Sequence, residues 1–350
     1  MVVFACAGCG APLTARVTRV ALPDHAHQHH GHDLLPALLE PGTYAVNPEP
    51  SGPPWRPWDE VGAEEAEARG VYAPVYSLSY GPTGEILLAP GDVRGTVVIP
   101  DRCDGYCCGL DGRDGPNLAC AECRSPVATR VDDCSLWQVV RLDPRAVRPV
   151  AVEGPACRAD EWDSLREEHR RTPPLEPLGW WSPQWTAAAG VALAHLLAAS
   201  GGRRVTVPAG LVAEAFCGVI DALLPPGPPE LKLVLAGPGL PVVAGDIALV
   251  PRHPQTGQVW PSGTAATVPL AAGVWASMAF TDDRRLAPAA AGMPEEARRD
   301  DPPPLLPIRP FRPDVDVFLH RLARLPEVRE PWLRAIHDLV RDRRYRLPYF

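Results

Sequence analysis

The pattern of apolar and polar positions divides the chain into a β-rich first part and a mixed second part. Up to residue 152 the apolar runs are short and bounded by Pro, Gly or Asp, which is typical of strands; they occupy residues 43–46, 85–89, 95–99 and 136–142. Beyond residue 183 the runs lengthen and predict helices over 184–200 and 208–224, which end at Gly201-Gly202 and at a PPGPP stretch. We expect further strands at 231–236 and 246–250, and extended segments near 257–260 and 273–280.

Two features of the second part concern exposed polar residues and tryptophans. Residues 245–260 indicate a β-hairpin with a polar tip, on which His253 would be exposed. Trp180, Trp181 and Trp185 precede or open the first long helix. This group forms either a lid over the second core or an aromatic binding surface.

The C-terminal pattern predicts two short amphipathic helices, near 314–325 and 329–344. Their apolar residues recur every three or four positions: Val315, Phe318, Leu319, Leu322 and Leu325 in the first, and Trp332, Leu333, Ile336, Leu339 and Val340 in the second. We expect these faces to dock on the chain's own core or on a partner. The outer face then carries Arg341, Arg343, Arg344 and Arg346.

An internal repeat is the strongest chemical signal. Residues 4–17 (FACAGCGAPLTARV) and 118–131 (LACAECRSPVATRV) are identical at seven of fourteen positions. Each copy is Cys-x-x-Cys, a turn, a Pro and a β-prone run. Four thiolates from two such copies suit a tetrahedral Zn²⁺ ion, and the residues concerned are Cys6, Cys9, Cys120 and Cys123.

This pattern resembles the knuckle of zinc-ribbon and rubredoxin-like proteins. The resemblance implies a structural Zn²⁺ whose four protein ligands leave no position for catalytic water, with iron as an alternative metal and a redox or coincidental arrangement as another. The chain departs from the usual pattern in two ways. It places 110 residues between the knuckles, and Arg124 occupies a position where Gly is common.

The sequence thus predicts an α+β fold. We expect a β-rich zinc-ribbon domain over 1–152 with a long insertion between the knuckles, a linker over 153–183, an α+β domain over 184–299, a Pro-rich linker over 300–313 and a basic helical tail over 314–350.

The other cysteines suggest a weaker second metal site. Cys103, Cys107, Cys108 and Cys134 flank the second knuckle, and a further ligand would come from the His-rich tract. Free thiols near the ribbon are the simpler interpretation, and a catalytic cysteine is a third. Asp132-Asp133 beside Cys134 is expected to be a solvated turn, while Cys157 and Cys217 have the character of small core residues.

Residues 25–32 (HAHQHHGH) hold five of the ten histidines. In an extended segment His25, His27 and His29 would share one face, since side chains alternate, and neutral imidazoles bind transition metals. A mobile, solvated loop without a structural role is the alternative, and under it replacing the histidines would leave stability unchanged.

Charge and composition limit the function. The chain has a net charge of −8, and only residues 309–350 are basic, with 10 Arg against 6 acidic residues. A nucleic-acid-binding domain usually presents a basic face, so we expect no nucleic-acid binding at physiological salt. We expect no secretory signal, because residues 1–10 lack a basic region and a sustained apolar core. We also expect no membrane span, because the longest apolar helical stretch, 186–200, is shorter than the ~20 residues that span a bilayer.

We therefore expect a cytoplasmic structural-zinc protein, of bacterial composition, that acts as a protein-binding module. Two alternatives remain open. One is an enzyme whose pocket lies between the two regions, with catalytic residues that the sequence does not identify. The other is nucleic-acid binding through the ribbon and the Arg-rich tail.

Overall fold

The computed structural model describes residues 1–32, 34–153, 160–165, 172–176, 178–263, 266–280, 307–343 and 346–350. Their contacts separate the chain into two compact units. The first comprises Met1–Ala66, Val75–Ala159 and Gln255–Gly257, and the second Glu67–Pro74, Asp160–Pro254 and Gln258–Phe350. Together they have the α+β composition that the sequence predicted.

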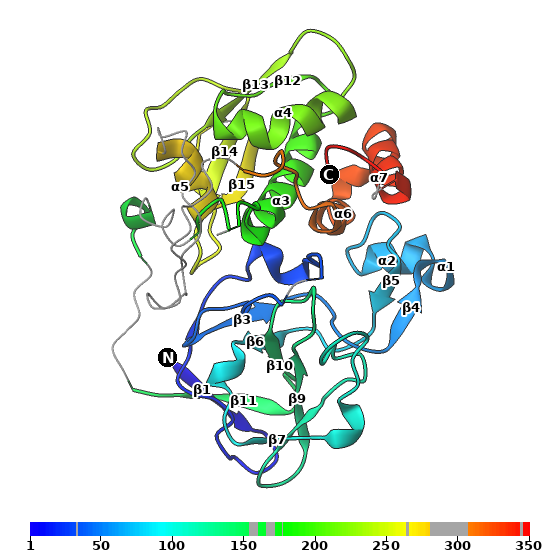
Figure 1. The fold of residues 1–350 in the computed structure, drawn as a ribbon, viewed down its shortest axis with the longest axis vertical. Coiled ribbons are helices and arrows are strands. Elements are labelled where there is room, and N and C mark those ends of the chain that lie inside the picture. Colours follow the sequence, from blue (N-terminus) through cyan, green and yellow to red (C-terminus); the bar gives the residue numbers. More distant parts are fainter. Residues whose placement is uncertain are drawn as a thin grey trace. The chain divides into compact units, whose positions relative to one another are not determined.

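The first unit is built on an irregular seven-stranded sheet with the strand order β2-β3-β6-β10-β9-β8-β7 (Figure 1). Two smaller sheets accompany it, one pairing β1 with β11 and one pairing β4 with β5. The strands are β1 Val2–Cys6, β2 Thr18–Arg19, β3 Thr43–Asn47, β4 Trp55–Pro57, β5 Ser77–Ser79, β6 Glu85–Leu88, β7 Thr96–Val98, β8 Leu118–Cys120, β9 Pro126–Val131, β10 Val139–Leu142 and β11 Val147–Ala151. Short helices lie between them: η1 Asp24–His27, α1 Trp58–Val61, α2 Ala63–Ala68, η2 Pro90–Asp92 and η3 Pro100–Arg102.

Apolar cores cover both faces of the central strands of this sheet. On β6, Ile86 and Leu88 enter one core cluster and Leu87 enters another. The same alternation divides Val139 from Val140 on β10. Side chains of a strand alternate between faces, so a strand covered on both sides reads as a continuous apolar run. This accounts for the strands predicted over 85–89 and 136–142.

The second unit contains a four-stranded parallel sheet, β12-β13-β14-β15. Its strands are β12 Val205–Thr206, β13 Leu231–Leu235, β14 Ile247–Arg252 and β15 Ala266–Ala271. Its helices are α3 Pro183–Ser200, α4 Leu211–Leu223, α5 Ala272–Phe280, α6 Val315–Leu322, the short η6 Pro326–Arg329 and α7 Pro331–Arg343. The predicted helices 184–200 and 208–224 are thus present as α3 and α4, and α3 ends at Gly201 in the left-handed conformation.

Three expectations for this unit are wrong or incomplete. Residues 273–280, expected to be extended, form α5, whose Ala-rich sequence favours a helix. The predicted hairpin over 245–260 is confined to its tip. Most of β14 pairs in parallel with β15, while Arg252 and Val259 form an antiparallel bridge beside backbone hydrogen bonds from His253 N to Gln258 O at 2.8 Å and from Trp260 N to Pro251 O at 3.0 Å. His253 is buried at 3% exposure, with Nε2 2.9 Å from the carbonyl oxygen of Asp160.

The tryptophans and the terminal helices close the core of the second unit. Trp181 and Trp185 are buried and contact Phe311, with ring centroids 4.8 and 6.5 Å away, which favours the lid interpretation for these two, whereas Trp180 is 43% exposed. The helix α6 packs against α3, as Figure 1 shows. Its Val317 joins a small apolar cluster on α3, and Phe318 is fully buried. The docking of the terminal helices on the chain's own core is therefore observed.

Gly190 permits the contact between α3 and α6, and its substitution tests this packing. A Cβ atom at position 190 would lie 2.7 Å from the Asp314 oxygen and 3.2 Å from the Phe318 nitrogen. We expect Gly190→Ala to destabilise the second unit by ~1–3 kcal/mol through overpacking, as measured by urea denaturation followed by tryptophan fluorescence. The matched control is Gly218→Ala in α4, where a Cβ meets no atom within 4 Å. This exposed helical site should gain ~0.5–1 kcal/mol, and equal effects of the two substitutions would contradict the packing argument.

Candidate metal centre

The two Cys-x-x-Cys segments adopt the same backbone structure. Cys6 ends β1 and Cys120 ends β8, and each is followed by a tight turn. In the first turn Gly10 N donates to Cys6 O at 2.9 Å, and in the second Arg124 N donates to Cys120 O at 2.9 Å. The backbone amide of the first cysteine in each segment also donates to a carbonyl five residues later: Cys6 N to Ala11 O at 2.8 Å, and Cys120 N to Ser125 O at 2.9 Å. The repeat in sequence is therefore a repeat in structure.

The residue after the second cysteine has a left-handed backbone in both turns. Gly10 has φ 80° and Arg124 has φ 61°. The second turn therefore keeps its shape although Arg124 replaces the usual Gly. The left-handed conformation costs a non-glycine residue ~1–2 kcal/mol, so Arg124 adds local strain. At Gly10 a Cβ atom would also lie 3.3 Å from Nη2 of Arg148, which places a guanidinium beside this turn.

The turns bring the four sulfur atoms together. The Sγ atoms of Cys6 and Cys123 are 3.6 Å apart, as are those of Cys9 and Cys120, and all four lie within 4.8 Å of one another. Two sulfurs on one tetrahedral zinc lie ~3.7–4 Å apart, given Zn–S bonds of ~2.3 Å. The four cysteines thus form a group that can hold one metal ion.

The surroundings of the thiols favour one thiolate over its neighbours. The hydroxyl and the backbone amide of Ser125, followed by Cys6, lower the pKa of Cys123 to about 6. The Ala11 amide also lowers the pKa of Cys9, but burial and the hydrogen bonds with the other three thiols raise it to about 12. Without a metal, the close contact of the four sulfur atoms thus favours the protonated form of Cys9. A bound cation would displace that proton, because the thiolate is the form of cysteine that binds metals.

The remaining predicted cysteines form a second group, with one exception. The side chains of Cys107, Cys108, Asp133 and Cys134 offer ligand atoms within 4.8 Å of one another. Cys103 is outside this group, because its Sγ donates to the Ile99 carbonyl at 3.2 Å. Cys157, expected to be a core residue, lies outside the described residues.

Asp133 belongs to this second group and is not on the solvated turn that we expected. It is only 4% exposed. Hydrogen bonds lower the pKa of Asp133 to about 2, and the largest contribution comes from the backbone amide of Cys108. The Cys108 thiol and the backbone amides of Cys134 and Cys107 also lower this pKa. Conversely, the Cys107 side chain, together with burial and Cys108, raises the pKa of Cys134 to about 12.

The histidine tract is neither extended nor entirely solvated. Residues 24–27 form the 3₁₀ helix η1, so the alternation that would place His25, His27 and His29 on one face is absent. His25 is buried and packs on Trp137, with ring centroids 4.3 Å apart. His29 is exposed. The tract contributes a different histidine to the cysteines, His32, whose Nδ1 lies 3.2 Å from Cys134 Sγ. The sequence holds no signal that separates His32 from its four neighbours.

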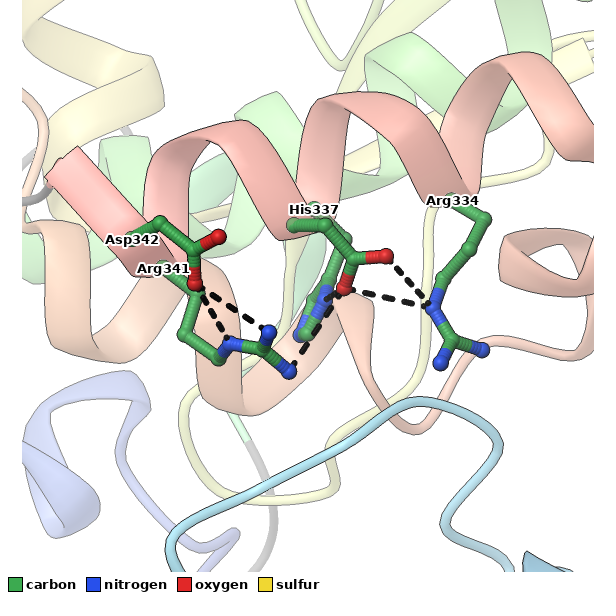
Figure 2. Close-up of polar contacts among 5 residues, drawn as sticks. Arg334, His337, Arg341 and Asp342 are labelled. Carbon is green, nitrogen blue, oxygen red and sulfur yellow. Dashed lines mark hydrogen bonds and ion pairs between the residues drawn. The ribbon is translucent and has the colours of Figure 1, made fainter.

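The basic C-terminal helix carries its own counter-charges. In α7, Asp338 lies between Arg334 and Arg341, at 3.1 and 3.6 Å, and Arg341 also contacts Asp342 at 3.1 Å (Figure 2). The neighbouring His337 is 1% exposed, with Nδ1 3.2 Å from Asp338, and its burial lowers its pKa. Ion pairing of this kind reduces the positive field that a polyanion would meet.

Comparisons of the chain with family models, with curated protein sequences and with solved structures gave no match. Among the helices of the described ranges, none combines the length and apolar character that crossing a bilayer requires.

Replacing an exposed cysteine of the first group tests metal binding. We expect Cys9→Ser or Cys123→Ser to remove one equivalent of bound metal, measured by mass spectrometry of the purified chain. We expect either change to lower Tm by ~10 °C or more, because metal binding is linked to folding. A loss of 1 kcal/mol in the free energy of unfolding lowers Tm by ~2–4 °C in a domain of roughly 150–250 residues. Cys103→Ser is the control and should retain both properties. An unchanged melting curve in the two variants would refute the assignment.

The paired arginines of α7 predict that the chain does not bind nucleic acid at physiological salt. The chain outside residues 309–350 sums to −12, and neutralised phosphates supply most of such affinity. We expect no shift of duplex or single-stranded probes in a gel assay. A shift that disappears when Arg341, Arg343, Arg344 and Arg346 are replaced with Gln would disprove this expectation.

Proposed function

We propose that the chain is a cytoplasmic structural-zinc protein that binds another protein. The observation that supports the zinc is the convergence of four cysteine sulfurs within 4.8 Å on two equivalent turns. Four protein ligands complete a tetrahedral shell, as in structural sites, whereas catalytic zinc sites keep one position open. A thiolate site also requires reduced cysteines, which a cytosol maintains.

The zinc would join two parts of the first unit that lie far apart in sequence. Cys6 ends the first strand, β1, and Cys9 lies in the turn after it, while Cys120 ends β8 and Cys123 lies in the turn between β8 and β9. Cys6 and Cys120 are buried in the same core cluster as Phe4 and Leu118, at the strand positions that the repeat makes equivalent. A metal at this point would fix the N-terminal strand to the main sheet, which is a structural role.

Exposed aromatic residues support the binding role. Strands β4 and β5 pair antiparallel and are joined by a segment that contains α1 and α2; we call this pair the β4–β5 hairpin. On it Trp55 is 52% exposed, and Tyr76, directly before β5, is 96% exposed. Trp58 N donates to Tyr76 O at 3.3 Å, so the two segments are paired beyond the strands. Trp and Tyr are the residues most enriched among those that dominate binding energy at protein interfaces. We propose that these two exposed side chains, carried on segments that pair with each other, contact the protein partner.

Acidic residues beside the hairpin indicate the character of the partner. Asp59, Glu60 and Glu64 are exposed on α1 and α2, which directly follow β4. Tyr80 Oη donates to Glu65 at 2.5 Å, which connects α2 to the residue after β5. Complementary charges guide association and select partners. We therefore propose a partner with a basic rim around an apolar centre.

Truncating the two aromatic side chains tests this proposal. The full chain is used to capture proteins from its host, and the affinity of the recovered partner is then measured by calorimetry. We expect Trp55→Ala with Tyr76→Ala to weaken binding at least ~10-fold, since a single such residue contributes ~2 kcal/mol or more. The metal content should remain unchanged.

The matched control is Tyr106→Ala, because Tyr106 is a comparably exposed tyrosine (87%) that belongs to neither β4 nor β5. It should bind like the unmodified chain. A partner that binds the double variant and the unmodified chain equally would overturn the assignment of the hairpin.

A further inference from the structure

Three thiols and an imidazole converge on one turn of the first unit, apart from the four cysteines already described. Cys107 and Cys108 come from the loop after η3, and Cys134 follows β9. The imidazole of His32 lies between two of them, with Nδ1 3.2 Å from Cys134 Sγ and Nε2 3.9 Å from Cys107 Sγ. The three Sγ atoms lie within 4.8 Å of one another.

Asp133 holds the three cysteines in place. Its carboxylate accepts hydrogen bonds from the backbone amides of Cys107, Cys108 and Cys134, at 3.3, 2.9 and 2.8 Å. It also lies 3.2 Å from the Cys108 Sγ. Carboxylates that orient ligands in this way are common around metal sites. One buried side chain thus fixes the backbone at every thiol of the group.

The loop that carries Cys107 and Cys108 is fastened to the same turn. Leu110 and Asp132 exchange two backbone hydrogen bonds, at 2.9 and 2.7 Å. At Gly109 this loop approaches the segment at Asp132 so closely that a Cβ atom on residue 109 would lie 1.9 Å from the backbone oxygen of Asp132. Only glycine allows this approach, so the loop sequence is specifically suited to bringing its thiols to Cys134.

The histidine segment is attached to the other side of the turn. His30 N donates to Ser135 O at 3.0 Å, and Leu38 N donates to Gln138 O at 2.9 Å. Trp137 Nε1 donates to Gln28 Oε1 at 3.2 Å. These contacts place His32 beside Cys134 through the backbone on both sides of it. The position of His32 is thereby set by the fold.

We propose that Cys107, Cys108, Cys134 and His32 bind a second transition-metal ion, with Zn²⁺ as the class of metal that this donor set fits. Three thiolates and one imidazole form a recognised tetrahedral zinc shell. Asp133 acts as a positioning residue whose hydrogen bonds orient the ligands. The site is independent of the four-cysteine group, because the two share no ligand.

The second site differs from the first in exposure. In the second site Cys107, Cys108 and His32 are exposed and only Cys134 is buried. In the four-cysteine group two ligands are exposed, while Cys6 and Cys120 are buried in a core cluster. Solvent and chelators reach exposed ligands more readily. Of two bound ions, a chelator should therefore remove the second-site ion first.

The test measures metal stoichiometry on the full chain. We expect the unmodified chain to bind two equivalents of Zn²⁺ or of the spectroscopic substitute Co²⁺, by mass spectrometry and by titration of the visible cobalt bands. Cys108→Ser and Cys134→Ser should each bind one. His32→Ala should weaken the second equivalent at least ~10-fold, since even residues that only orient ligands account for ~10–100-fold in affinity.

Two control variants separate the site from its surroundings. Cys103→Ser removes a neighbouring thiol bonded to Ile99, and His29→Ala removes an exposed histidine of the same tract. Both should keep two equivalents. His32→Ala alters an exposed side chain, so it remains informative even if the cysteine variants fail to fold.

Three results would overturn the proposal. The first is a single equivalent in the unmodified chain that Cys123→Ser abolishes. The second is equal affinity of the His32→Ala and His29→Ala variants for the second ion. The third is a Cys107–Cys108 or Cys107–Cys134 disulfide in the freshly purified chain with no second ion after reduction. A failure of the four-cysteine assignment has a different signature, because Cys123→Ser would then leave the stoichiometry unchanged.

Discussion

The pairing of β1 with β11 is the constraint on which the first unit depends. Five residue pairs join the two strands, from Val2 with Ala151 to Cys6 with Val147, so the first residues of the unit lie beside its last strand. The pairing places the first knuckle next to the loop at Ala146, to whose carbonyl Ala7 N donates at 2.9 Å. Residues 10–119 can therefore form most of the main sheet without separating the two halves of the candidate metal site.

Local sequence determined much of the fold and of the first site. Strands β3, β6 and β10 and helices α3 and α4 were predictable because each carries its own apolar period and its own stop signals. The four-cysteine group was predictable because each knuckle is a local motif that occurs twice. Residues 273–280 were predicted incorrectly, since short Ala- and Gly-rich apolar runs fit either a strand or a helix until their packing is known.

The second cysteine group shows where local sequence ceases to be sufficient. Its ligands come from three segments that have no common motif, and His32 is one of five histidines in eight residues. The choice among them is made by backbone contacts with Ser135 and Gln138, which no periodicity encodes. Cys103 was assigned to the group because it flanks the second knuckle together with Cys107 and Cys108, but its thiol donates a hydrogen bond to the Ile99 carbonyl instead. Asp133 was assigned to a solvated turn because neighbouring side chains on a strand point in opposite directions, so that Asp132 and Asp133 would not act as a carboxylate pair.

The packing around the two Cys-x-x-Cys turns implies that a bound metal and the core would contribute separately to stability. Cys6 and Cys120 lie in a cluster with Leu13, Val127 and other buried residues, and a protonated cysteine behaves there as a small apolar residue. These positions would therefore stay packed without a bound metal, unlike those of a minimal zinc finger, which unfolds without its ion. The exposed halves of the knuckles, Cys9 and Cys123, have no such packing. The metal would accordingly hold the turns and the N-terminal strand in register on a sheet whose core is formed by apolar side chains.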